Sequence, residues 1–132
     1  LGDAEVLARI EKLVPSIAAA AGEGFTQKGG MIYEKTVEET DADHHWWVQA
    51  ETVVGYFNLW DHFGSQEGLE NALMCWDFIK DHIIDRENGE WFWSLRADGT
   101  VNRDDDKAGF WKCPYHNGRM CLEVIERTAQ KP

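Results

Sequence analysis

Long stretches of this sequence carry apolar residues three or four positions apart, the spacing that places side chains on one face of an α-helix. This spacing predicts helices over residues 3–21, 44–63 and 66–84, and a shorter one over residues 118–129. Asp3 and Ser65 are candidate N-caps, and Pro15 within the first predicted helix is a warning, because an interior proline can kink or end a helix. The sequence therefore predicts a mainly α-helical fold.

Between the third and fourth predicted helices the apolar spacing changes from helical to alternating. Trp91, Trp93 and Leu95 alternate with other residues, and Asp98-Gly99 is a strong signal for a tight turn. We therefore expect a short hairpin over residues 90–101. Residues 31–37 are predicted to form at most a short extended segment, followed by an acidic loop over residues 38–43 that ends in a helix cap.

Length and charge restrict the kind of protein. The chain has 132 residues, enough for one domain with a hydrophobic core. Its 24 acidic and 13 basic residues give a net charge of −11, which argues against a nucleic-acid or anionic-membrane partner. No apolar run is long enough to span a bilayer. Three cysteines without a tandem CxxC pair indicate free thiols in a reducing compartment, so we expect a cytoplasmic protein.

Residues 111–119 (WKCPYHNGR) concentrate chemically versatile side chains without helical or strand periodicity. Pro114 removes a backbone donor and favours an extended Cys113, so we expect a loop that directs side chains into a cleft. His116 is a candidate general acid/base because its ordinary pKa lies near neutral pH. Trp111 and Arg119 flank it in this loop. The alternative is a partly buried histidine that bonds to the backbone.

A second candidate group lies on the predicted helix 44–63. At about 100° per residue, Trp47, Glu51 and Asn58 fall together on the flank of its apolar stripe, where they are placed to face a cavity. Glu51 is a candidate to orient or deprotonate a hydroxyl, or it is simply an exposed glutamate. Seven tryptophans favour a ligand site with stacking faces, although Trp46 and Trp47 individually suit a core. His44 and the residue after it are expected at the surface beside the helix cap.

Metal and cofactor patterns are incomplete. Cys113-x-x-His116 is half of a zinc spacing without a second pair. Residues 102–106 have the acidic spacing of a calcium loop but lack its glycine and closing glutamate. No glycine-rich phosphate loop is present. We therefore expect neither a metal nor a cofactor.

Three ordered blocks, residues 45–51 (HWWVQAE), 89–92 (GEWF) and 111–119, resemble the N-acylglucosamine 2-epimerase superfamily. Within it, the form of residues 111–117 is similar to the cellobiose/mannobiose 2-epimerase branch. The resemblance extends over nearly the whole chain. It implies an (α/α)6 barrel with its active site at the end that carries the hairpins.

The resemblance also implies a reaction and roles for individual residues. Two histidines on opposite faces of an open-chain sugar exchange the C2 proton through a cis-enediol(ate), which inverts C2 in the reducing-end sugar of a β-1,4 disaccharide such as cellobiose or mannobiose. His116 matches one of the two, Trp111 a tryptophan that stacks on the sugar, and Trp46 and Glu51 residues that line the site. The helical spacing favours Trp47 over Trp46, and Arg119 is a further substrate-binding candidate.

The resemblance further implies that residues 1–132 are a single partial domain, the C-terminal third of such an enzyme, since the superfamily members are about three times as long. The chain would then hold about four of twelve barrel helices. The second histidine would lie upstream, and the apolar helix faces would be exposed or covered by self-association. Two alternatives remain open. The parent is an aldose–ketose isomerase of the same superfamily, or the isolated chain is an inactive carbohydrate-binding or assembly module.

Overall fold

The structure, a computed structural model, describes residues 2–129. It confirms the mainly helical prediction. The helices are α1 (Ala4–Gly22), α2 (Trp46–Phe63), α3 (Gln66–Phe78), the π-helical turn η1 (Ile79–Ile83) and α4 (Tyr115–Ala129). The predicted helix 66–84 is thus confirmed almost to its end, although its last turn is wound as a π-helix.

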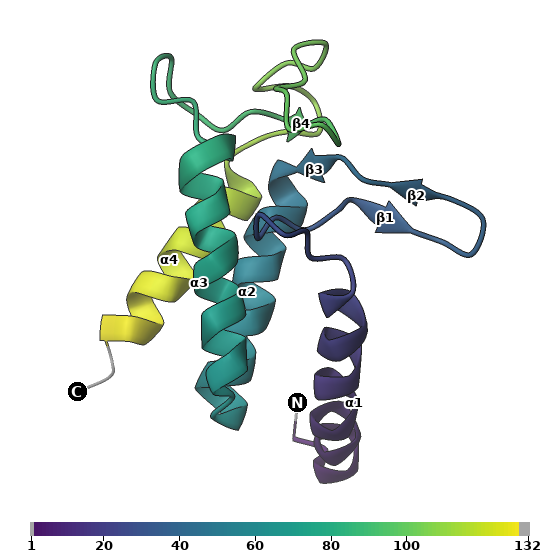
Figure 1. The fold of residues 1–132 in the computed structure, drawn as a ribbon. Helices are drawn as coiled ribbons and strands as arrows, with labels where there is room; N and C mark the ends of the chain where they lie inside the picture. The colour runs from purple at the N-terminus through teal and green to yellow at the C-terminus, as the bar shows by residue number, and fades with distance from the viewer. Residues whose placement is uncertain (1, 130–132) are drawn as a thin grey trace.

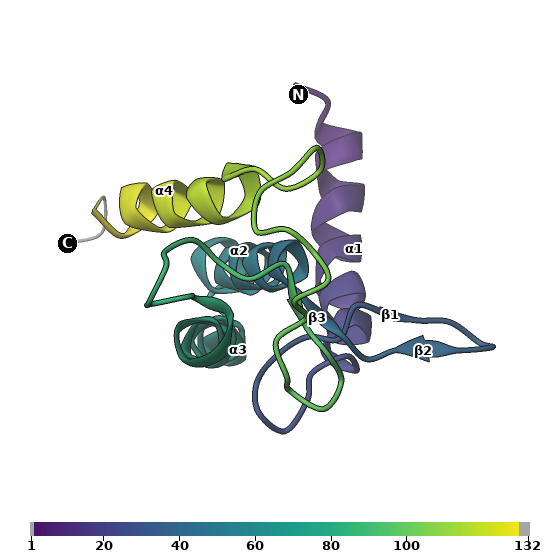
Figure 2. The same ribbon diagram turned by 90° about the horizontal axis from the view of Figure 1, so that it is seen from above.

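Helix α2 lies at the centre of the molecule, with α3 along one side and α4 along another (Figures 1 and 2). Helices α2 and α4 begin at the same end, whereas α1 and α3 run in the opposite direction (Figure 1). Helix α1 stands at the edge of the group. Across residues 2–129, no helix is both long and apolar enough to cross a membrane.

Two small antiparallel sheets lie at the end where α2 and α4 begin (Figure 1). In one, β1 (Glu34–Lys35) pairs with β2 (Thr40–Asp41), so the expected loop over residues 38–43 contributes a strand. In the other, β3 (His44–His45) pairs with β4 (Ser94–Leu95). The predicted hairpin over residues 90–101 is present only around its turn, with a bridge between Leu95 and Val101 and a hydrogen bond from Arg96 N to Thr100 O, while the other edge of β4 pairs with β3.

The core forms where α2, α3 and η1 meet, and Ala50, Cys75, Ile79 and Ile83 are fully buried there. Gln49 is also fully buried. Its side-chain amide accepts a hydrogen bond from Met31 N and donates one to Met31 O, both at 2.8 Å. This pairing satisfies the backbone of the loop before β1, so the loop is held against α2.

Two glycines show how differently the sides of α2 are filled. A Cβ at Gly68 of α3 would stand 2.8 Å from Leu59 Cβ and 2.9 Å from Tyr56 O, so α2 and α3 touch backbone to backbone. A Cβ at Gly55, on the side of α2 that faces α1, would meet nothing within 4 Å. The packing of α2 is therefore tight toward α3 and open toward α1.

Helix α1, over its whole length Ala4–Gly22, contains no buried residue. Leu13 is 56% exposed and Ile17 is 65% exposed. Leu122 and Ile125 on α4 are also exposed. The expectation that apolar helix faces would lack partners is confirmed for these side chains.

Two predictions of local structure are wrong. Helix α4 begins at Tyr115 rather than at residue 118, because Pro114 precedes its first turn and Gly118 N donates back to Pro114 O at 2.9 Å. His44 is not at the surface but is only 5% exposed. The pairing of β3 with β4 places its ring against Phe78, with the ring centroids 5.0 Å apart.

Candidate active site

The centre of the candidate site is a pair formed by Glu51 on α2 and His116 in the first turn of α4. His116 Nδ1 lies 2.7 Å from Glu51 Oε1. Both side chains are about two-thirds buried. The two residues are 65 positions apart in the chain, and the packing of α4 against α2 brings them together.

Alternating charges continue from this pair along the seam between the two helices. Arg119 donates one hydrogen bond to Glu51 Oε2 and another to Glu123 Oε1, the latter at 2.7 Å. Glu123 Oε2 accepts from Arg127 at 2.6 Å, and Arg127 also donates to Asn58 on α2. We call Glu51, Arg119, Glu123 and Arg127 the charge ladder. Arg119 thereby secures the carboxylate that contacts His116.

The charge ladder determines which ring nitrogen of a neutral His116 carries the proton. Partial burial alone would raise the pKa of Glu51, but the hydrogen bonds from Arg119 and His116 outweigh it and lower that pKa. Glu51 is therefore ionised at neutral pH and only accepts hydrogen bonds. It follows that the proton of a neutral His116 lies on Nδ1, which leaves the Nε2 lone pair free to take a proton. The same contacts raise the pKa of Arg119.

Aromatic rings surround the histidine. The ring centroid of Trp47 lies 5.9 Å from that of His116, and that of Trp46 lies 6.3 Å away. Trp46 is 4% exposed and packs against Trp93 in the core, whereas Trp47 is half-buried and borders a cavity. Tyr115, which precedes His116 in the chain and is not among the predicted site residues, has its ring centroid 4.9 Å from that of His116.

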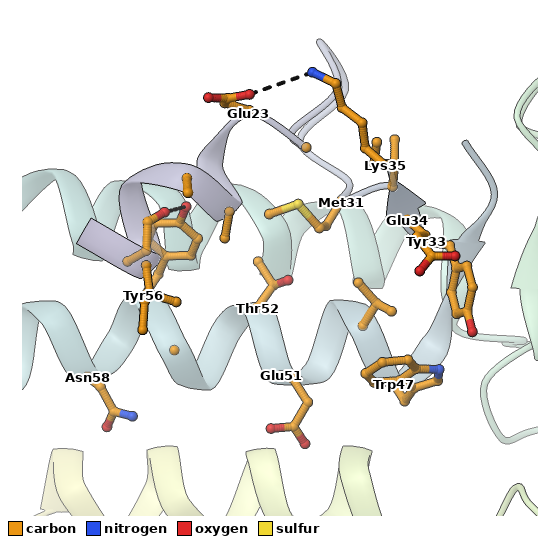
Figure 3. A pocket seen from close by; sticks show the side chains of 18 of the residues that line it. Glu23, Met31, Tyr33, Glu34, Lys35, Trp47, Glu51, Thr52, Tyr56 and Asn58 are labelled. Atoms are coloured by element: carbon orange, nitrogen blue, oxygen red, sulfur yellow. Dashed lines mark hydrogen bonds and ion pairs between the residues drawn. The ribbon is translucent and has the colours of Figure 1, made fainter. Parts of the chain in front are cut away.

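A cavity of about 600 Å³ opens between α1 and α2 (Figure 3). Trp47, Glu51 and Asn58 all line it, as their helical spacing predicts. Figure 3 shows the Glu51 carboxylate pointing away from α1 toward α4, where His116 lies. Glu51 therefore forms the boundary between this mainly apolar cavity and the His116 side of α2.

Trp111 lies apart from this group. It is 77% exposed, and its ring meets Phe110 edge-on at 4.9 Å. The structure thus gathers Trp46, Trp47, Glu51 and Arg119 around His116 and leaves Trp111 at the surface. Its stacking on a sugar stays a prediction. Within residues 2–129, no three His, Cys, Asp or Glu side chains are grouped closely enough to hold a metal ion, and Cys113 is exposed.

Known proteins resemble this chain in sequence and in the arrangement of its helices. A cellobiose 2-epimerase of Bacteroides fragilis is 65% identical over 127 residues, which are 95% of this chain and 32% of that protein. A D-mannose isomerase of Marinomonas mediterranea is 30% identical over 103 residues, which are 76% of this chain and 26% of that protein. The chain therefore spans about a quarter to a third of the length of these curated relatives.

The crystal structure of a sugar epimerase from a ruminal bacterium matches with a TM-score of 0.88 at 38% identity, over 96% of this chain and 33% of that one. The four helices accordingly fit the C-terminal part of an (α/α)6 barrel. The model of the family "N-acylglucosamine 2-epimerase (GlcNAc 2-epimerase)" matches residues 3–118. With most of its length matched in this way, the chain belongs to the N-acylglucosamine 2-epimerase family.

Proposed function

We propose that this chain supplies one half of the catalytic site of a sugar 2-epimerase. The substrate class is a β-1,4 disaccharide such as cellobiose or mannobiose, and the reaction inverts C2 of its reducing-end sugar. The observation that carries the proposal is the contact of His116 Nδ1 with a Glu51 carboxylate that Arg119 secures. The 65% identity to a cellobiose 2-epimerase supports the substrate class.

The geometry suits the removal of a proton next to a carbonyl. With Nδ1 held by Glu51, the Nε2 lone pair of His116 acts as the base toward C2 of the open-chain sugar. The imidazolium that forms then faces an ionised carboxylate, which stabilises its charge. A second group, protonated and on the other face of the enediolate, delivers a proton to C2, and we infer that it lies outside these 132 residues because the resemblance to the superfamily implies a second histidine upstream.

The test is solvent-deuterium exchange at C2 of cellobiose, followed by NMR in the full-length protein that contains this chain. The substitution His116→Ala removes the proposed base, and we expect the exchange rate to fall by about 10²- to 10⁴-fold. His62→Ala is the matched control, because His62 is exposed at the far end of α2. Unchanged exchange in a folded His116→Ala protein would refute the proposal.

A second candidate reaction is aldose–ketose isomerisation, which the similarity to a D-mannose isomerase favours. The same enediol gives a ketose when its proton returns to C1 instead of C2. Chromatography of the products separates the two reactions, since a keto sugar without the C2 epimer indicates isomerisation.

We further propose that the 132-residue chain alone does not turn over sugar, because it supplies one of the two bases. In isolation it is at most a carbohydrate-binding or assembly module, and its exposed apolar faces on α1 and α4 favour self-association. Light scattering of the purified chain measures its oligomeric state. Epimerisation by the isolated chain would require a second base within residues 1–132.

A further inference from the structure

Lys112 is the most deeply buried charged side chain of the described chain. The residue is 1% exposed although it stands in the loop just before α4. Its Nζ donates to Glu90 Oε1 at 3.1 Å and to Lys107 O at 2.7 Å, and it lies 5.5 Å from the ring centroid of Trp46. A lysine is rarely buried unless its ammonium is paired, so these three partners compensate for its removal from water.

Glu90, the partner of Lys112, has an unusual backbone. Within residues 2–129 it is the only residue other than glycine with a positive φ, at 62°. Such a conformation is unfavourable for a residue with a side chain and persists only where the surroundings hold it. Here the side chain holds it, because Glu90 Oε1 also accepts from its neighbour Trp91 N at 3.0 Å. Burial opposes ionisation of Glu90, but the hydrogen bonds from Trp91 and Lys112 outweigh it and lower its pKa.

Glu90 Oε1 makes a third contact, with the residue that follows His116 in the chain. Asn117 Nδ2 donates to Glu90 Oε1 at 3.0 Å. Glu90 therefore binds Lys112, four residues before His116, and Asn117, one residue after it. A single carboxylate oxygen thus holds the segment that carries His116 at both of its ends.

A second set of contacts, made by Lys107, supports this arrangement. Lys107 donates to Asp85 Oδ2 at 2.5 Å and to Gly89 O at 3.0 Å, while its own carbonyl accepts from Lys112. The loop after β4 is therefore fastened to the turn that contains Gly89 and Glu90. Neither the contacts of Glu90 nor those of Lys107 involve Glu51 or the His116 ring directly.

We propose that Lys112 and Glu90 are positioning residues that set the orientation of the His116 ring toward its proton-transfer partner. The proposal rests on the function proposed above for His116. The contacts of Glu90 Oε1 with Lys112 and Asn117, which we call the clamp, fix the backbone on both sides of His116, and Glu51 then fixes the ring. Loss of the clamp leaves His116 in place but free to turn away from Glu51. A misplacement of about 1 Å at a reacting group can lower a rate by about 10²-fold.

The test compares Lys112→Met with Lys80→Met in the full-length protein. Lys80 is a close match, because it also pairs with a carboxylate (Asp77, 2.6 Å) and also lies over an indole (Trp76, 6.0 Å), but its side chain is 40% exposed and it is far from His116 in the chain. In Lys112→Met we expect kcat for C2 exchange to fall about 10- to 100-fold with KM changed less than about twofold. Lys80→Met should leave both constants unchanged.

A second readout separates the clamp from the proposed reaction. In ¹⁵N NMR of the imidazole, the Nδ1–H signal of His116 that reports its bond to Glu51 should weaken in Lys112→Met and persist in Lys80→Met. If the unaltered protein shows no exchange, the proposed function fails while this signal still tests the clamp. Glu90→Met removes the accepting oxygen and keeps a side chain of similar length, so it gives the same test where Lys112→Met does not fold. Retention of kcat and of the Nδ1–H signal in a folded variant of either residue would overturn the proposal.

Discussion

Helices α1 and α2 have nearly the same length, 19 and 18 residues, and an apolar face each, yet they are packed in opposite ways. Helix α2 buries eight residues, whereas α1 buries none. The exposed apolar residues of α1 are Val6, Leu7, Ile10, Leu13 and Ile17. Amphipathic spacing therefore specifies a helix and its face, but only a neighbouring element converts that face into core.

This difference in packing between α1 and α2 matters for the candidate site, because the site residues come from the well-packed helices. Glu51 and Trp47 come from α2, and His116 and Arg119 from α4, so the chemistry stands on the well-packed pair of helices. Helix α1 contributes one wall of the neighbouring cavity and no member of the charge ladder. Perturbing α1 should therefore change the cavity before it changes the Glu51–His116 contact.

The largest expected contrast is between two isoleucines. Ile79→Ala in the fully buried core should lower the free energy of unfolding by about 2–5 kcal/mol, through lost contacts and a cavity. At a protein concentration at which the chain is monomeric, Ile10→Ala on α1 should change it by less than about 0.5 kcal/mol, because Ile10 is already exposed. Urea unfolding of the 132-residue chain measures both. A loss above about 1 kcal/mol for Ile10→Ala would mean that a partner covers α1 in solution.

A smaller contrast of opposite sign is expected from one substitution at two glycines. Gly68→Ala drives a methyl group into Tyr56 O and Leu59, and should destabilise the chain by about 1–3 kcal/mol. Gly55→Ala meets open space inside a helix and should stabilise it by about 0.5–1 kcal/mol. Thermal unfolding followed by circular dichroism gives both shifts. Destabilisation by Gly55→Ala would show that the side of α2 facing α1 is filled.

The smallest contrast concerns two ion pairs. Glu51→Gln should cost about 1 kcal/mol at pH 7, since it breaks the contacts to Arg119 and His116. Glu23→Gln, which removes the exposed 3.6 Å pair with Lys35 near the end of α1, should cost close to nothing. Because the pKa of Glu51 is lowered on folding, its contribution is complete above its ordinary pKa of about 4.3 and is lost as the pH falls through the lowered value. Unfolding curves at several pH values should therefore converge for Glu51→Gln and the unaltered chain in acid, and a gap that widens in acid would contradict this account.

Features that depend on local spacing were predictable from the sequence. The apolar periods located α1, α2 and the 66–83 segment, and the 100° step placed Trp47, Glu51 and Asn58 on one flank of α2, where they line the cavity. The same helical spacing favoured Trp47 over Trp46 as a residue facing the cavity, and Trp46 is the more deeply buried of the two.

Features that depend on distant partners were not predictable in this way. The burial of His44 follows from β3 pairing with β4, some fifty residues later in the chain. The first turn of α4 shows no apolar period because His116 and Arg119 point toward Glu51 rather than into the core. The proline before it was a helix-start signal that the aromatic composition of residues 111–119 obscured. The burial of Lys112 had no local signal at all, since its partner Glu90 lies 22 positions away.

The charge ladder has a consequence for the way such sequences diverge. Arg119, Glu123 and Arg127 are spaced four residues apart, so Glu123 in the middle pairs with both arginines, and Arg119 also pairs with Glu51 on another helix. Reversal of one charge would turn two attractive contacts into repulsive ones at once. Among relatives, Glu123 and its two arginines are therefore expected to change together or to remain together, and Glu51 and Arg119 to co-vary across the seam.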